Sequence, residues 1–396
     1  MKRFGISVLA AAVVAGTPLM AQTFEDAVAN GTTGAMLRLA HISQDNPTGT
    51  EDSSATAIGG QLKYETAQWN GLSFGAAAYV SQKIDALSGD GAKLNPDFFD
   101  DQQDSFAYIG EAYIDYSRGD FALRVGRQQI DTPLADTDDI RMLPNTFEAA
   151  IATYTGVEKL TLVGGYVTRW AGFDSGDDIS KFKRLDGASS SGAAVAGAFY
   201  EGIDNLELQG WYYGIDELAD AAFADAFYQL PINETIDMEF GAQAGYFSER
   251  KNSNIDGQVL GAFATAEVSA FRFSGAFNIA RNGDGEAVTN GFGGGPYFTS
   301  MEEMTIDGLN DAEAYNVSVE ADFEELGVKG LAALLAYGAF ESGTTSAEKA
   351  EEIDMVVAYA MDEHVFAELS YAQIEDKNEN LGGDWSRWLL RLNYNF

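Results

Sequence analysis

The stretch from Gly119 to Tyr154 reads GDFALRVGRQQIDTPLADTDDIRMLPNTFEAAIATY, two alternating segments separated by a polar one. In the first segment Phe121, Leu123 and Val125 fall on one face, the period-2 pattern of a strand whose two sides meet different surroundings. The connecting range 129–146 is long for a loop between neighbouring strands, and loops of this length are usually functional. The stretch therefore predicts two strands joined by a functional loop.

The composition excludes several classes of function. The chain has 24 Lys plus Arg against 61 Asp plus Glu, a net charge of −37, which argues against a nucleic-acid partner because phosphate neutralisation needs clustered cations. There is no cysteine, and His41 and His364 are the only histidines, so thiolate, disulfide and most zinc chemistry is absent. We expect no cofactor and no metal site.

Residues 1–21 have the pattern of a secretory signal peptide. Lys2 and Arg3 give a basic start, an apolar centre follows, and Ala21 is a small residue before the expected cleavage point. The alternative, an N-terminal membrane anchor, is disfavoured because the apolar run is too short to span a bilayer. Residues 22–34 are then expected to form a short periplasmic segment.

From residue 35 to residue 396 the alternation rarely stops, and we expect a single unit of about eighteen strands. Their predicted ranges are 35–43, 57–66, 71–82, 106–117, 120–128, 147–154, 160–170, 192–200, 205–214, 222–230, 236–247, 256–267, 270–281, 312–322, 329–340, 352–360, 364–374 and 386–396. Most are nine to twelve residues long, close to the roughly 9–11 residues with which a tilted strand crosses a membrane. Short turns alternate with long loops, as in bacterial barrels and unlike a soluble β-sandwich. The fold class is therefore all-β, a transmembrane antiparallel up-and-down β-barrel.

The C-terminal strand SRWLLRLNYNF supports this fold class. Trp388, Tyr394 and Phe396 share one face with two leucines, as a lipid-facing surface with aromatic girdles requires. A terminal Phe after such a strand resembles the signal read by the barrel-assembly machinery of the Gram-negative outer membrane. The alternative, an edge strand of a secreted sandwich, would leave an apolar edge open to aggregation.

If the apolar face of each strand meets lipid, the other face lines the lumen. The pore-lining cations predicted by this parity are Arg38, Lys63, Arg124, Arg169, Arg272, Arg387 and Arg391. The predicted pore-lining acids are Glu111, Asp115, Glu207, Glu239, Asp354 and Glu368. Most of the surplus negative charge lies in loops, in the ranges 97–104, 174–178, 284–286, 302–303 and 348–352. We interpret these runs as a solvated outer surface, with bridging of divalent cations as the alternative.

Several motifs resemble the OprD-type porins, particularly the branch common in Campylobacterota-like bacteria. They are FEDAVANG before the first strand, GRQ followed by TPL, DIRMLPNTF, GFGGGPYFTSMEEMTI in a late loop, and the terminal NYNF. The resemblance implies an eighteen-stranded channel in which the loop 129–146 folds inward as a constriction. It also implies an arginine track that guides carboxylate-bearing solutes past an acidic side of the constriction, with Arg127 and Arg141 at matching motif positions.

We therefore expect a porin for passive diffusion of small hydrophilic solutes such as ions, amino acids and small carboxylates. Its constriction loop would set opposite charges across the lumen. The residues assigned to this role are Asp131, Asp136, Asp138, Asp139 and Arg141. The expected surroundings are outer-membrane lipid and lipopolysaccharide, and the oligomeric state could be a monomer or a loose trimer.

Two other function classes remain as alternatives. The acidic loops would also suit a surface-exposed structural or adhesive barrel. An outer-membrane hydrolase is disfavoured, because neither histidine has a GxSxG serine or an HExxH pair beside it.

Overall fold

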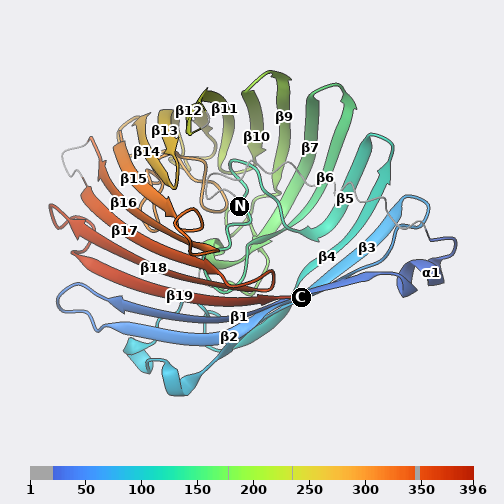
Figure 1. Ribbon diagram of the computed structural model, residues 1–396, viewed down its shortest axis with the longest axis horizontal. Helices are drawn as coiled ribbons and strands as arrows, with labels where there is room; N and C mark the ends of the chain where they lie inside the picture. Colours follow the sequence, from blue (N-terminus) through green and yellow to red (C-terminus); the bar gives the residue numbers. More distant parts are fainter. Residues whose placement is uncertain (1–20, 177, 234, 344–347) are drawn as a thin grey trace.

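The computed structural model describes residues 21–176, 178–233, 235–343 and 348–396. The predicted signal peptide lies almost entirely outside these residues. The described chain forms a single antiparallel sheet that closes on itself as a barrel (Figure 1). Among the described residues, no helix is both long and apolar enough to cross a bilayer.

The strands of the first half begin close to the predicted positions. They are β1 (Thr32–Asp45), β2 (Ser53–Glu65), β3 (Leu72–Lys83), β4 (Phe106–Arg118), β5 (Phe121–Gln128), β6 (Thr146–Val157), β7 (Leu160–Ala171), β8 (Lys183–Arg184), β9 (Ala193–Ile203) and β10 (Leu206–Ile215). The second half contains β11 (Ala219–Asn233), β12 (Ile236–Glu249), β13 (Gly257–Val268), β14 (Phe271–Arg281), β15 (Glu313–Asp322), β16 (Leu331–Glu341), β17 (Lys349–Ala360), β18 (Val365–Asp376) and β19 (Trp385–Asn395). The helical pieces are α1 (Phe24–Ala29) and the 3-10 turns η1 (Asp85–Leu87), η2 (Gly91–Lys93) and η3 (Phe173–Ser175).

Eighteen of these strands of the described chain form the barrel wall, and the predicted fold class is confirmed. The extra strand, β8, is a two-residue segment that pairs with β7 beyond the end of β9. The wall closes where β19 meets β1, with the register running from Met36 opposite Asn395 to Asp45 opposite Ser386. Figure 1 shows β19 and β1 side by side at this closure.

The N-terminal segment is shorter than expected. A capping box in which Thr23 and Asp26 bond each other's backbone N–H groups begins α1. Strand β1 then starts at Thr32, inside the range assigned to the periplasmic segment, because Thr32 and Thr33 pair with the end of β2.

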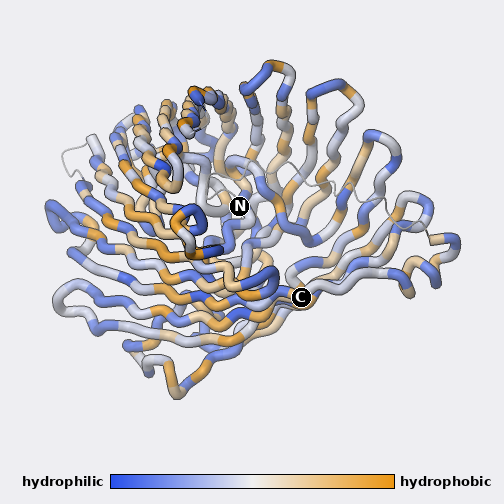
Figure 2. The backbone as a smooth tube through the Cα atoms, in the orientation of Figure 1, coloured by the Kyte–Doolittle hydropathy of each residue, from blue (hydrophilic) through white to orange (hydrophobic). Residues whose placement is uncertain are grey.

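The wall carries the predicted alternation of faces. On β19, Trp388, Leu390, Leu392 and Tyr394 are exposed, whereas Arg387 is buried on the other face. Figure 2 shows the resulting alternation of apolar and polar positions along the strands. Because side chains alternate with a period of two, the sequence of each strand determines which of its faces points outward. A slip of one residue would turn its whole apolar set inward.

Candidate functional site

Two long loops enter the barrel and pack against each other. The loop 129–145 joins β5 to β6, and the loop 282–312 joins β14 to β15. The backbone N–H of Asp136 donates to the carbonyl of Phe292 at 2.9 Å, and the N–H of Phe292 donates to the carbonyl of Leu134 at 3.1 Å. Leu134 is fully buried, and Phe292 packs edge-on against Trp170. The interior is therefore narrowed by two docked segments.

The glycine run of the second loop makes this docking possible. Gly293 has a φ of +137°, and a Cβ added there would lie 2.7 Å from the carbonyl oxygen of Asp136. Gly291 has a φ of +80°, and its added Cβ would lie 2.4 Å from the carbonyl oxygen of Leu134. Both positions need the left-handed backbone and the missing side chain of glycine.

Replacing Gly293 with valine is expected to weaken the docking of the two loops by about 2 kcal/mol, because the added side chain overpacks this close contact. The same substitution at a glycine with open space around it should not have this cost. Gly285→Val is the matched control, because Gly285 lies in the same loop, also has a positive φ of +78°, and has nothing within 4 Å of an added Cβ. The measurement is the rate of limited proteolysis within 129–145 in the assembled barrel. Equal cleavage rates for the two variants would show that the close approach does not hold the loops.

Arg38 of β1 binds the tip of the first loop. Its guanidinium forms a bidentate ion pair with Asp139, with N···O distances of 2.6 and 2.8 Å, and donates to the carbonyl of Arg141 at 2.7 Å. Arg391 of β19 donates to the carbonyl of Asp139 and pairs with Glu368. The two arginines keep Asp139 ionised, since they hold the pKa of that carboxyl below its usual range despite its burial.

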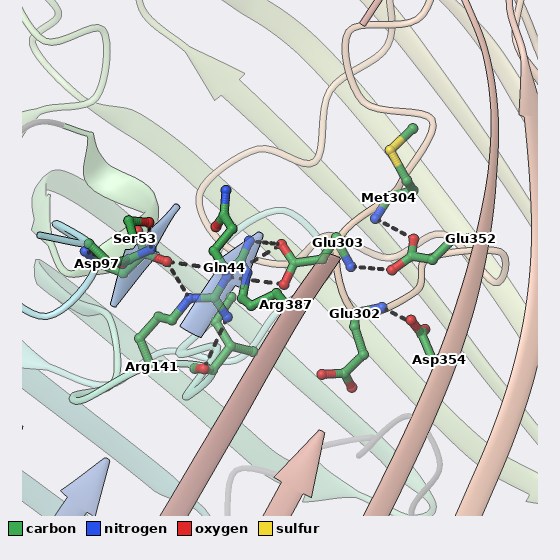
Figure 3. A network of polar contacts seen from close by, with 12 residues as sticks. Gln44, Ser53, Asp97, Arg141, Glu302, Glu303, Met304, Glu352, Asp354 and Arg387 are labelled. Atoms are coloured by element: carbon green, nitrogen blue, oxygen red, sulfur yellow. Dashed lines mark hydrogen bonds and ion pairs between the residues drawn. The ribbon is translucent and has the colours of Figure 1, made fainter. Parts of the chain in front are cut away.

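Arg141 and Arg387 meet two carboxylates that come from different loops (Figure 3). Arg141 donates from Nε to Asp97 at 3.0 Å and from Nη2 to Glu303 at 3.3 Å. Arg387 contacts the same two carboxylates, at 3.1 Å in the case of Asp97. Arg141 also lies 4.5 Å from the ring centre of Phe173. The four charges join the range 84–105, the loop 129–145, the loop 282–312 and strand β19.

Two acids of β17 hold the backbone beneath Glu303. Glu352 accepts from the N–H groups of Glu303 and Met304 at 3.0 and 2.8 Å, and Asp354 accepts from the N–H of Glu302 at 3.1 Å. Figure 3 shows these carboxylates pointing at the turn. Asp354, predicted to line the pore, therefore anchors the second loop.

The other aspartates of the first loop form an acidic cluster with Asp174. Burial raises the pKa of Asp131, that of Asp136 to about 6 and that of Asp138 to about 8, and the neighbouring carboxylates Asp136 and Asp174 add to the shift at Asp138. The pKa of Asp174 is raised by the same burial, although the Asn145 amide donates to it at 2.6 Å. The loop thus separates Asp139, which faces arginines, from acids that face one another.

The remaining predicted wall residues lie mostly in cross-strand ion pairs on the inner face. The pairs are Lys63–Glu111 at 2.8 Å, Arg124–Asp115 at 2.7 Å and Arg272–Glu239 at 2.8 Å. Glu207 lies opposite Phe227, which is buried against Phe298 of the second loop. These positions follow the alternation of their strands, and their role in conduction stays a prediction.

Arg127 and Arg169 differ from the predicted orientation. Arg127 lies opposite Glu148, on the face that carries exposed Val125, and Glu148 lies opposite Arg169. In β7 a bulge adds one residue between Val167 and Arg169, which turns Arg169 to the outer face. We therefore remove both arginines from the pore-lining set.

Sequence reasoning also missed four acids that the structure brings inside. Asp97, Asp174, Glu302 and Glu303 belong to runs interpreted as solvated outer surface, yet each contributes to the packed loop region. Plain charge patterning could not separate them from exposed acids. The one signal was the position of Glu302 and Glu303 inside GFGGGPYFTSMEEMTI. Neither histidine joins the site: His41 bonds Thr56 on the wall, and His364 lies at an exposed turn.

Several solved structures have the same architecture. OccK8 (OprE) of Pseudomonas aeruginosa matches with a TM-score of 0.77 at 18% identity, covering 93% of this chain and 98% of that one. A BenF-like porin from Pseudomonas fluorescens Pf-5 matches with a TM-score of 0.81 at 16% identity, covering 93% and 99%. Pseudomonas aeruginosa OpdK with vanillate matches with a TM-score of 0.76 at 16% identity, also covering 93% and 99%. These likenesses establish the fold.

The family follows from the sequence. No curated protein sequence matches the chain significantly. The family model described as "outer membrane porin, OprD family" matches residues 30–379, most of the barrel and both docked loops. The chain therefore belongs to the OprD family of outer membrane porins.

Proposed function

We propose that the two docked loops form the selectivity region of this porin and that they give it a mild preference for cations. The family and the barrel fold are those of Gram-negative outer-membrane channels, through which small hydrophilic solutes diffuse passively. Selection in such a channel depends on charges and pore width along the path. The loops that narrow the interior are therefore the place where selection is expected.

The observation that carries the cation preference is the pairing of the arginines. Arg38, Arg141, Arg387 and Arg391 each have a carboxylate partner within the protein. An anionic solute must compete with these internal partners. The cluster around Asp138 and Asp174 has fewer cations to neutralise it and adds negative charge as it ionises.

Reversal potentials in a planar bilayer test this proposal. With a KCl gradient at low salt we expect a reversal potential whose sign indicates cation selectivity. This potential should decrease at high salt, because the field of the carboxylates is screened. Arginine and glutamate salts then compare organic ions of opposite charge. Vanillate is a useful further anion, because OpdK has been crystallised with it. A clear anion preference would overturn the proposed selectivity, and a closed barrel would overturn the channel role of these loops.

Several finer properties belong to the same proposal. Sequence patterns support three of them. These are the role of the predicted pore-lining residues, the export of the chain by its N-terminal signal, and the recognition of the terminal Phe396 by the assembly machinery. The kinship with a Campylobacterota-like branch rests on the quoted motifs, and a monomer and a loose trimer both fit the closed wall.

A further inference from the structure

An unusual group of three arginines lies on the outer face of the barrel wall, at the long-loop ends of β5, β7 and β8. Arg127 and Arg169 flank Glu148 in the register of the sheet, and Arg184 of β8 lies opposite Arg169. The face is the outer one, because it also carries the exposed side chains of the apolar wall. We call Arg127, Arg169 and Arg184 the outer arginine cluster.

The cluster has more positive charge than its acidic partners neutralise. Glu148 is shared by two guanidiniums, with N···O distances of 3.1 Å to Arg127 and 3.8 Å to Arg169. Arg184 donates to the carbonyls of Ser189 and Ser190, and no carboxylate of the described residues forms an ion pair with it. Like charges directly opposite each other on a sheet are destabilising. Arg169 and Arg184 occupy that arrangement, which an external anion would relieve.

Other arginines on the outer rim of the described chain do not share this surplus. Arg281 pairs with Glu313 of the neighbouring strand, and Arg250 pairs with Asp220. Asp186, two residues after Arg184, is engaged by the N–H groups of Ala188 and Ser189. The surplus of cations is local, in a protein whose net charge is −37.

The wall directly below the cluster is apolar and hollowed. A groove of about 440 Å³ is lined by Arg127, Glu148, Val125, Ala150 and Tyr166, among others. Val125 and Tyr166 are 45% and 41% exposed, as expected of residues that face lipid. Tyrosines on the outside of barrels mark the boundary between headgroups and acyl chains. The arginines therefore lie at headgroup level, with an acyl-chain surface beneath them.

We propose that the outer arginine cluster and this groove bind one lipid A molecule of the outer leaflet. The guanidinium groups of Arg169 and Arg184 would hold a lipid A phosphate, since arginine binds phosphate through paired N–H donors. The small side chains of the groove would pack against an acyl chain. The site lies on the opposite side of the wall from the lumen, so it is independent of solute selection.

The test compares lipid A with its dephosphorylated form. The full-length barrel is purified in a mild detergent, and lipid binding is followed by native mass spectrometry. We expect the wild type to retain bisphosphorylated lipid A and to bind the dephosphorylated lipid roughly tenfold more weakly, from the loss of charge-assisted contacts. Arg169→Gln/Arg184→Gln is expected to abolish this difference.

Arg281→Gln is the matched control, because it removes an outward-facing rim arginine that has its own carboxylate, and it should bind lipid A as the wild type does. If the double variant fails to assemble, Arg184→Gln alone replaces it, because it leaves both Glu148 ion pairs in place. This single variant should weaken lipid A binding severalfold. Binding that is equal with and without phosphates, or unchanged in the cluster variants, would overturn the proposal. Conductance should be the same in all variants, which separates this result from any failure of the proposed selectivity.

Discussion

Replacing Arg141 with alanine is expected to free the inward loop 129–145 and to raise the single-channel conductance. Arg141 is 4% exposed, and its guanidinium joins Asp97 and Glu303, which belong to two other loops. Removing one member of a buried ion-pair network costs about 3 kcal/mol, because the buried carboxylates lose part of the charge that compensates them. Arg387 still contacts both carboxylates, so the loss falls on loop docking and leaves the wall intact.

Planar-bilayer recording measures this effect. Arg141→Ala should show larger and noisier open-channel currents than the wild type. Arg281→Ala is the control, since its partner Glu313 is exposed and such a pair contributes at most about 1 kcal/mol. A conductance of Arg141→Ala equal to that of the wild type would mean that the loop holds its position without this contact.

Raising the pH from 5 to 9 is expected to increase the permeability of potassium relative to chloride by roughly two- to fivefold, from about 0.4–1 kcal/mol of added attraction. Burial raises the pKa of Asp136 to about 6 and that of Asp138 to about 8, so both carboxyls hold protons at pH 5 and lose them within this window. Each lost proton adds one negative charge at the contact of the two loops.

The same titration affects loop docking. A carboxyl group with a raised pKa holds a proton in the folded state over a range where the unfolded chain has released it. Docking is therefore favoured at low pH and weakens as the pH rises through the folded-state values near 6 and 8. Protease cleavage within 129–145 should accordingly become faster toward pH 9.

Asp138→Asn isolates the upper part of this pH response. The variant should lose the change in selectivity between pH 7 and 9 and keep the change near pH 6. Asp362→Asn is the control, because Asp362 accepts backbone bonds at an exposed turn and its pKa is lowered by them. If Asp138→Asn kept the full wild-type response, another group would be the source of the titration.

Reasoning from the sequence located the wall well because its signals are local. Each of the eighteen predicted strands overlaps a strand of the structure, and the inward positions of Arg38, Arg387 and Arg391 follow from simple alternation. The failures have local causes too. A bulge beside Arg169 reversed the alternation, and Arg127 was assigned from a motif against the parity of its own strand.

The candidate site was only partly predictable. The sequence identified the loop with Asp139 and Arg141, but it assigned the partners Asp97 and Glu303 to the exposed surface. The residues that flank an acidic residue in the sequence do not indicate whether its loop folds back into the barrel. Docking depends on glycines such as Gly293 that permit close backbone approach to a segment far along the chain.

By itself the sequence determined the class of fold, the number of strands and the two faces of most of them, because the period-two alternation of a strand depends only on consecutive residues. Only the tertiary structure decided which charges meet. Arg141 and Glu303 are 162 residues apart, and Arg387 and Asp97 are 290 apart. Contacts at such separations depend on the closure of the whole barrel and on the paths of three loops within it, and short-range patterns do not record either.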